Sequence, residues 1–158
     1  YGLLAYWQAD FKQARAYYEE SEELYQKVGH LLNVSWSRVN IAYVVLRQGD
    51  YEEAKKMFRV CVQQFQKANN TIALIYAMEG LASLNVNQGQ AERATQLFAW
   101  ADAMRDQIGD HRPPIEQASV ERDLEVVHST LNEAEFEKLS REGRAMTTEQ
   151  TIALASED

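Results

Sequence analysis

Gly49-Asp50-Tyr51-Glu52-Glu53-Ala54 is the middle one of three related segments that stand 40 residues apart along the chain. The other two are Ala9-Asp10-Phe11-Lys12-Gln13-Ala14 and Gly89-Gln90-Ala91-Glu92-Arg93-Ala94. A period of this length is typical of repeat proteins, in which each unit buries its apolar face only against its neighbours. The sequence therefore predicts an array of repeats whose surface serves to bind partners.

The residues that follow each segment keep the same register. An aromatic residue stands four residues after the last alanine, and a small residue stands seven after it; these are Tyr18, Phe58 and Phe98, then Ser21, Cys61 and Ala101. This spacing marks one face of an α-helix, and small side chains on that face let a second helix approach closely. Residues 31–48 and 71–88 align as a further helix, so each unit is predicted to contain two helices.

The turn between the two helices of a unit is predicted from its capping residues. Gly49 and Gly89 stand where a helix end needs a positive φ, which glycine adopts at no steric cost. Asp50 is expected to cap the next helix while Glu53 reaches back to close a capping box. In the third segment Gln90 takes the place of the aspartate, so we expect that turn to fray more.

These features resemble the tetratricopeptide repeat. The resemblance rests on residues 49–54 followed by Phe58 and Cys61, with two weaker copies, and covers roughly residues 1–110. The usual unit of about 34 residues is shorter than the one found here, and the excess falls in longer helices. HEAT and armadillo repeats have periods nearer 40 but lack the Gly-Asp-aromatic turn. The resemblance implies an all-α fold, an α-α superhelix, built as a solenoid of antiparallel helix hairpins.

Three repeats and a C-terminal segment are expected. The repeats are assigned to residues 1–30, 31–70 and 71–110, the first of them truncated, and residues 111–158 are expected to form capping helices. In this last segment, Pro113-Pro114 stops one helix and can begin the next over 115–131, and Thr147 with Gln150 forms a capping box before a short final helix. A fourth helix hairpin within this segment is a further possibility.

The stretch Gly143-Arg144-Ala145-Met146-Thr147-Thr148-Glu149-Gln150-Thr151-Ile152-Ala153-Leu154-Ala155 carries a second resemblance. It is similar to the C-terminal end of bacterial multidomain signal-transduction ATPases, which include LuxR-type and SARP-type transcriptional regulators and ATPase-linked cyclases and kinases. In that group an NTPase core precedes the repeats, and no residue of that core is present in this chain. The resemblance therefore implies a parent protein, and no activity for this chain itself.

Composition and charge exclude several classes of function. With 24 acidic and 16 basic residues the net charge is −8, which disfavours direct binding of nucleic acid. No apolar run approaches the length of a membrane span and no signal segment opens the chain, so we expect a cytoplasmic protein without a membrane partner. The histidines and the lone Cys61 show no metal-ligand spacing, and no catalytic motif is present. We expect no catalytic residue, no metal and no cofactor, and Cys61 is expected to be a packed, inert thiol.

The candidate binding residues follow from the resemblance, because the first helix of each tetratricopeptide unit lines a concave groove. Carried over from the turn, the groove positions are Leu3, Tyr6, Trp7, Trp36, Val39, Asn40, Tyr43, Arg47, Tyr76, Glu79, Ser83 and Asn87. Four of them share one face of a single helix and mix aromatic rings with hydrogen-bonding groups, a composition typical of interfaces. The alternative is that Trp36 and Tyr43 simply pack between helices.

Two functions follow from this surface. One is a protein-interaction module that binds a peptide or a partner domain, such as a domain of its own parent chain. The other is an effector-sensing domain that binds a small molecule and controls an adjacent ATPase. The chain opens in the middle of a repeat's first helix, so we expect it to be a piece of a longer protein; exposed apolar residues there, Tyr1, Leu3 and Leu4, would favour pairing with a second copy.

Overall fold

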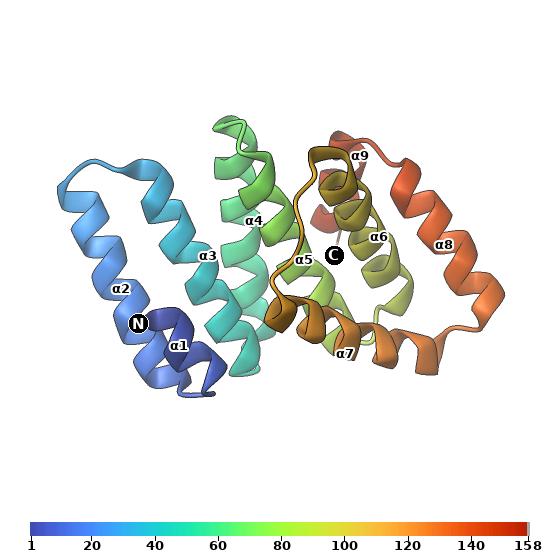
Figure 1. Ribbon diagram of the computed structural model, residues 1–158, viewed down its shortest axis with the longest axis horizontal. Coiled ribbons are helices and arrows are strands. Elements are labelled where there is room, and N and C mark those ends of the chain that lie inside the picture. The colour runs from blue at the N-terminus through green and yellow to red at the C-terminus, as the bar shows by residue number, and fades with distance from the viewer. Residues whose placement is uncertain (158) are drawn as a thin grey trace. The chain divides into compact units, whose positions relative to one another are not determined.

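The computed structural model describes residues 1–157, and every regular element among them is an α-helix (Figure 1). Helices α2, α4 and α6 begin at residues 11, 51 and 91, so the 40-residue period of the sequence is kept in the structure. The all-α fold of consecutive helix pairs is thereby confirmed. The helices are α1 (Gly2–Trp7), α2 (Phe11–Lys27), α3 (Leu31–Arg47), α4 (Tyr51–Lys67), α5 (Thr71–Asn87), α6 (Ala91–Ile108), α7 (Pro114–Thr130), α8 (Glu133–Ala145) and α9 (Thr148–Ser156).

The chain divides into two compact units, the first Tyr1–Ala77 and the second beginning at Met78, so the division falls inside α5. In the first unit α1 packs against α2, α2 against α3, and α3 against α4. Figure 1 shows α2, α3 and α4 as antiparallel neighbours. In the second unit α6 packs against α7, α8 and α9. Figure 1 shows α8 beside α6 and α7 at a steep angle to both.

The turns within the helix pairs confirm most of the capping prediction. Gly49 has a φ of +86° and Gly89 a φ of +74°. The Asp50 carboxylate accepts a hydrogen bond from the Glu53 amide at 3.2 Å. The second half of the predicted capping box is wrong, because the Asp50 amide donates to the carbonyl of Val45 at 3.2 Å and has no proton left for a carboxylate.

The small residue of each repeat lies at the centre of the packing. Ala14, Ala54 and Ala94 are all 0% exposed, and Phe58 and Phe98, one helical turn further on, are buried with them. A residue with no side chain beyond Cβ leaves room for the neighbouring helix backbone, and the aromatic ring fills the space beside it. The repeat pattern thus encodes the contact between the two helices of a pair.

Replacing Ala54 with leucine tests this packing. The larger side chain has no space in a fully buried site, so Ala54→Leu should lower the free energy of unfolding by roughly 1–3 kcal/mol through overpacking. The same change at Ala16, which is exposed on α2, is the matched control. Urea unfolding followed by circular dichroism measures both, and equal midpoints for the two variants would show that Ala54 is not at a close helix contact.

The C-terminal helices are fixed by two capping boxes and one close contact. At the start of α9 the Thr147 hydroxyl accepts from the Gln150 amide at 3.2 Å, and the Gln150 side-chain oxygen accepts from the Thr147 amide at 2.8 Å, which confirms the predicted box. The second box, Asn132 with Glu135, opens α8 and was not predicted. The predicted helix over residues 115–131 is present as α7, one residue earlier at each end.

Gly143 brings α8 against α6. A Cβ atom on this glycine would lie 2.4 Å from the carbonyl oxygen of Gln96 and 3.0 Å from the Cβ of Ala99. The obstacle is helix backbone, which cannot move aside as a flexible side chain can. This position therefore requires a glycine although its backbone is helical.

Gly143→Ala should destabilise the second unit. Alanine favours a helix interior over glycine by about 1 kcal/mol, so the sign of the effect separates helix propensity from packing. We expect the clash to dominate, with a loss of roughly 1–3 kcal/mol in the free energy of unfolding. Glu137→Ala, at an exposed position of the same helix, is the control, and thermal unfolding is the measurement. A rise in melting temperature for Gly143→Ala would contradict the close contact.

Candidate functional site

In the first unit, the predicted binding residues come from the first helix of each pair. Tyr6 lies on α1 and Tyr76 lies on α5. Helix α3 carries the other four residues in a row about three helical turns long: Trp36, Asn40, Tyr43 and Arg47. All six side chains are half-buried, so each presents part of its surface to solvent. We call these six residues the aromatic face.

Ring contacts hold the aromatic face together. The Tyr43 ring lies between Phe58, at 5.0 Å edge to face, and Tyr76, at 4.7 Å. The Trp36 ring stands 5.7 Å from the same Tyr76 ring and 5.6 Å from Phe65. Because Phe58 and Phe65 are fully buried, the aromatic face is the outer layer of the core of this unit. Trp36 and Tyr43 therefore combine the two interpretations, packing between helices and exposure on the surface. Their rings pack between helices, and their outer edges are exposed.

Hydrogen bonds orient the polar groups of the same face. The Tyr43 hydroxyl donates to the Tyr76 carbonyl at 2.7 Å, and the Tyr76 hydroxyl donates to the Asn40 side-chain oxygen at 3.3 Å. The guanidinium of Arg47 donates to the hydroxyl of Tyr6 at 3.1 Å, which joins α3 to α1. Side chains held in this way lose little conformational entropy when a partner binds.

The other predicted positions differ in accessibility. Val39 is 0% exposed, and Glu79 and Ser83 are each 4% exposed. Asn87 is exposed at the end of α5, where its amide donates to the carbonyl of Ser83 at 2.8 Å. A partner that contacts the surface therefore reaches Asn87 but not the three buried side chains. On α1, Leu3 is 50% exposed.

Glu79 is the centre of a buried ionic cluster in the second unit. Its carboxylate receives two hydrogen bonds from Arg105, from Nε at 2.8 Å and from Nη2 at 2.9 Å. Arg112 lies against the same carboxylate, with Nη2 2.7 Å from Oε1, and that nitrogen is also 2.5 Å from Asp102. Asp110 pairs with Arg105 from the other side. The cluster links α5, α6 and the segment before α7.

These charges determine how the two arginines titrate. Burial by itself would lower the pKa of Arg105, but the hydrogen bonds and charge of Glu79, with the charge of Asp110, raise the pKa above its ordinary value. The pKa of Arg112 is raised in the same way, by Glu79 and Asp102 against the effect of burial. Both guanidinium groups are thus permanently charged, and Glu79 is the carboxylate that balances them in the interior.

Sequence reasoning missed this cluster. The one signal was a lone carboxylate inside the apolar run of α5, Thr71-Ile-Ala-Leu-Ile-Tyr-Ala-Met-Glu79. Such a residue is buried only when it is paired. The identity of the pairing arginines could not be read from the chain, because Arg105 and Arg112 are 26 and 33 residues away from Glu79.

Glu79→Gln should therefore lower the free energy of unfolding of the second unit. The glutamine keeps the shape of the side chain but removes the one buried carboxylate that the two guanidinium groups share, so that each keeps only a more exposed aspartate, Asp110 or Asp102. Breaking a buried pair typically costs about 3–5 kcal/mol. Glu125→Gln on α7, an exposed position, is the matched control. Urea unfolding at neutral pH measures both. A loss below about 1 kcal/mol, the usual value of a surface pair, would contradict the role assigned to Glu79.

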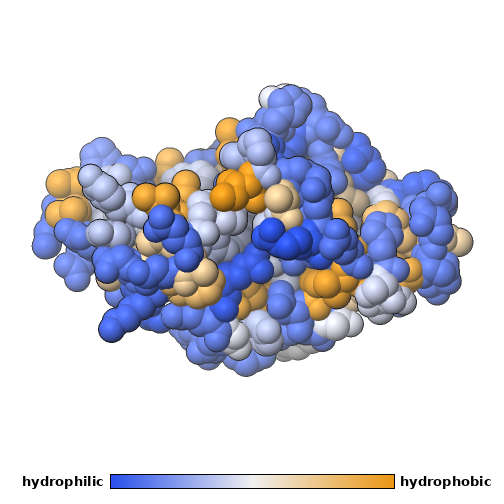
Figure 2. Space-filling view, turned by 60° about the horizontal axis from the view of Figure 1, so that its bottom comes forward, coloured by the Kyte–Doolittle hydropathy of each residue, from blue (hydrophilic) through white to orange (hydrophobic). Residues whose placement is uncertain are grey.

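Among the described residues no group of three or more His, Cys, Asp and Glu side chains is placed to hold a metal ion. Cys61 is 1% exposed, as predicted, and burial raises the pKa of its thiol to about 12, so the thiol stays protonated. No helix in residues 1–157 has both the length and the apolar character needed to cross a membrane. On the side of the molecule shown in Figure 2, apolar residues form separate patches among mostly hydrophilic ones.

The comparison with protein families agrees with the helix pairs just described. Residues 1–67 match the family model of the tetratricopeptide repeat. The match spans α1 to α4 and supports a tetratricopeptide-repeat domain in this chain, a fold that generally mediates protein–protein interaction and is typically a non-catalytic scaffold. Neither the curated proteins nor the solved structures contain a match to the chain.

Proposed function

We propose that this domain is a non-catalytic interaction module that binds a peptide or a partner domain through the aromatic face. The observation that carries the proposal is that tyrosine and arginine side chains fixed by hydrogen bonds, and a tryptophan fixed by ring contacts, stand half-exposed on successive first helices. These are the residue types enriched at the energetic centres of interfaces. The match to the tetratricopeptide repeat over residues 1–67 supports the same function.

The test is a binding experiment with selected peptides. A library of random peptides is displayed on phage and selected against the immobilised chain, and the enriched peptides are titrated against variants by fluorescence anisotropy. Trp36→Ala and Arg47→Ala should each weaken binding by about 1–2 kcal/mol, the cost of removing an anchor residue at the centre of an interface. Glu23→Ala, at an exposed position of α2, should leave the affinity unchanged.

The stability of each variant is measured alongside its affinity, because Trp36 also packs on Phe65. A loss of affinity measured at a temperature where the variant is fully folded reports lost contacts with the peptide, not unfolding. If the selected peptides bind Trp36→Ala and Arg47→Ala as tightly as the native chain, the aromatic face is not the binding surface. A parallel screen with small metabolites tests the effector-sensing alternative, and saturable binding of a metabolite that Trp36→Ala abolishes would replace the peptide proposal.

We further propose that the module works inside a larger cytoplasmic regulator of the bacterial signalling or transcriptional type. The support is the resemblance of residues 143–155 to the C-terminal end of such ATPases. In that setting α9, with its capping box at Thr147 and its buried Thr151 and Ala155, closes the second unit. The partner that binds the aromatic face is then another domain of the same regulator, or a peptide that controls the regulator.

A further inference from the structure

A second surface lies on the other side of α3. Arg38 stands two residues after Trp36, which places it about 200° around the helix and away from the aromatic face. Two hollows of about 430 and 290 Å³ meet at this arginine, and both are lined by α2, α3 and α4. We call them together the outer furrow. Its lining includes Gln26, Leu31, Leu32, Val34, Ser35, Gln64, Lys67 and Ala68 in the first hollow, and Glu22, Glu53, Lys56, Met57, Val60 and Cys61 in the second.

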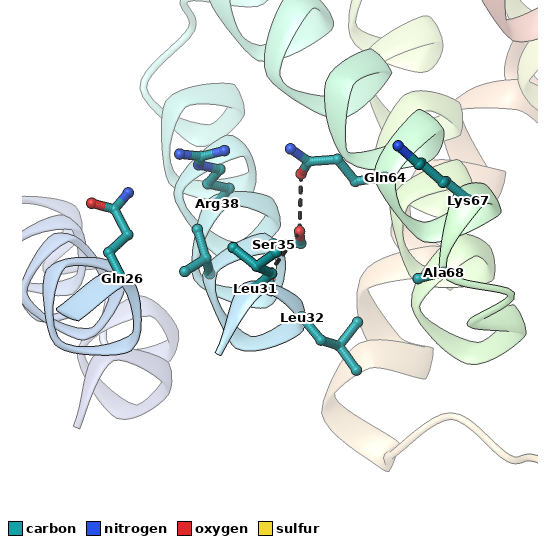
Figure 3. Close-up of a pocket in the computed structure, with 9 residues that line it drawn as sticks. Gln26, Leu31, Leu32, Ser35, Arg38, Gln64, Lys67 and Ala68 are labelled. Carbon is teal, nitrogen blue, oxygen red and sulfur yellow. Dashed lines mark hydrogen bonds between the residues drawn. The ribbon is translucent and has the colours of Figure 1, made fainter. Parts of the chain in front are cut away.

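Most of the surface area that lines the outer furrow is apolar. Leu31, Leu32 and Val60 are 76%, 42% and 45% exposed, although all three are large hydrophobic residues. The hydroxyl at its floor is already engaged, because Ser35 Oγ lies 3.0 Å from the Gln64 side-chain oxygen and 3.2 Å from the Leu31 carbonyl. Figure 3 shows Ser35 and Gln64 facing each other across the hollow, from α3 and α4. The furrow thus offers apolar contact and few free hydrogen-bonding groups.

The charges around the outer furrow are unevenly satisfied. Arg38 is paired with Glu22 at 2.8 Å and keeps 35% of its side chain exposed. Lys56 and Lys67 make no ion pair or hydrogen bond within the described part of the chain. They stand eleven residues apart on α4, which is about 16 Å along the helix. Besides the Arg38–Glu22 pair, the furrow thus carries two unpaired ammonium groups and one carboxylate, Glu53, in a chain whose net charge is −8.

We propose that the outer furrow docks an acidic amphipathic helix of a partner protein. A helix satisfies its own backbone hydrogen bonds, whereas an extended peptide needs a row of acceptors and donors, of which this lining offers few. Met57 and Gln64, which line different hollows, are seven residues apart on α4. Apolar residues at i and i+7 of a helix have the same spacing, about 10–11 Å, and fill one hollow each. Acidic residues on the same face then meet Lys56 and Lys67.

This surface is independent of the aromatic face, and its test uses a different probe. The probe is a fluorescein-labelled, alanine-based helical peptide of about 18 residues. It carries two leucines seven residues apart, flanked on the same face by glutamates, and anisotropy measures its affinity. A second peptide has lysines in place of the glutamates. The variants are Val60→Glu, the double change Lys56→Glu with Lys67→Glu, and Lys12→Glu on α2 as the control, all at exposed positions and all checked for helix content by circular dichroism.

We expect the glutamate peptide to bind the native chain and the Lys12→Glu control alike. Val60→Glu and the double variant should each weaken its binding by about tenfold or more, the effect of removing an anchor or of reversing both rim charges. The lysine peptide should bind the double variant more tightly than it binds either the native chain or the Lys12→Glu control. Absence of binding to the native chain, or equal binding to all folded variants, overturns the proposal.

Discussion

The close contact between the two helices of a pair, made possible by one alanine per repeat, is the constraint on which the rest of the structure depends. Because Ala14, Ala54 and Ala94 are completely buried, the helices pack near enough for Phe58 and Phe98 to fill the adjoining space. That contact sets the rotation of each helix about its own axis. It thereby fixes which side of α3 carries the aromatic face and which side carries the outer furrow.

The rotation of α3 gives this helix two different outer surfaces. On one side, half-buried rings are tied to buried phenylalanines and to backbone carbonyls, so the surface is rigid and rich in aromatic carbon. On the other side, exposed leucine and valine side chains surround a paired arginine. We propose the first surface for a peptide that adds hydrogen bonds to those already present. We propose the second for a partner that supplies apolar side chains and brings its own backbone hydrogen bonds.

The second unit is stabilised by different means. Glu79, Arg105 and Arg112 form a charged cluster in its interior, where desolvation would be costly if any member lacked its partner. Such a cluster adds little net stability over an apolar core, but its geometry permits only one arrangement of the three segments that carry it. Gly143 acts similarly on α8, because only this residue type allows the helix to approach the Gln96 carbonyl. These contacts specify how the C-terminal helices dock.

The sequence by itself determined the repeat period, the helix pairs, their start points, the positive φ at Gly49 and Gly89, and the buried register of Ala54 and Phe58. These features depend on residues within one or two helical turns, so local periodicity and capping chemistry encode them. Only the tertiary structure decided the rest. The burial of Glu79 depends on arginines more than 25 residues away. The outer furrow needs side chains from three helices, and no periodicity in one helix reveals what its neighbours leave uncovered.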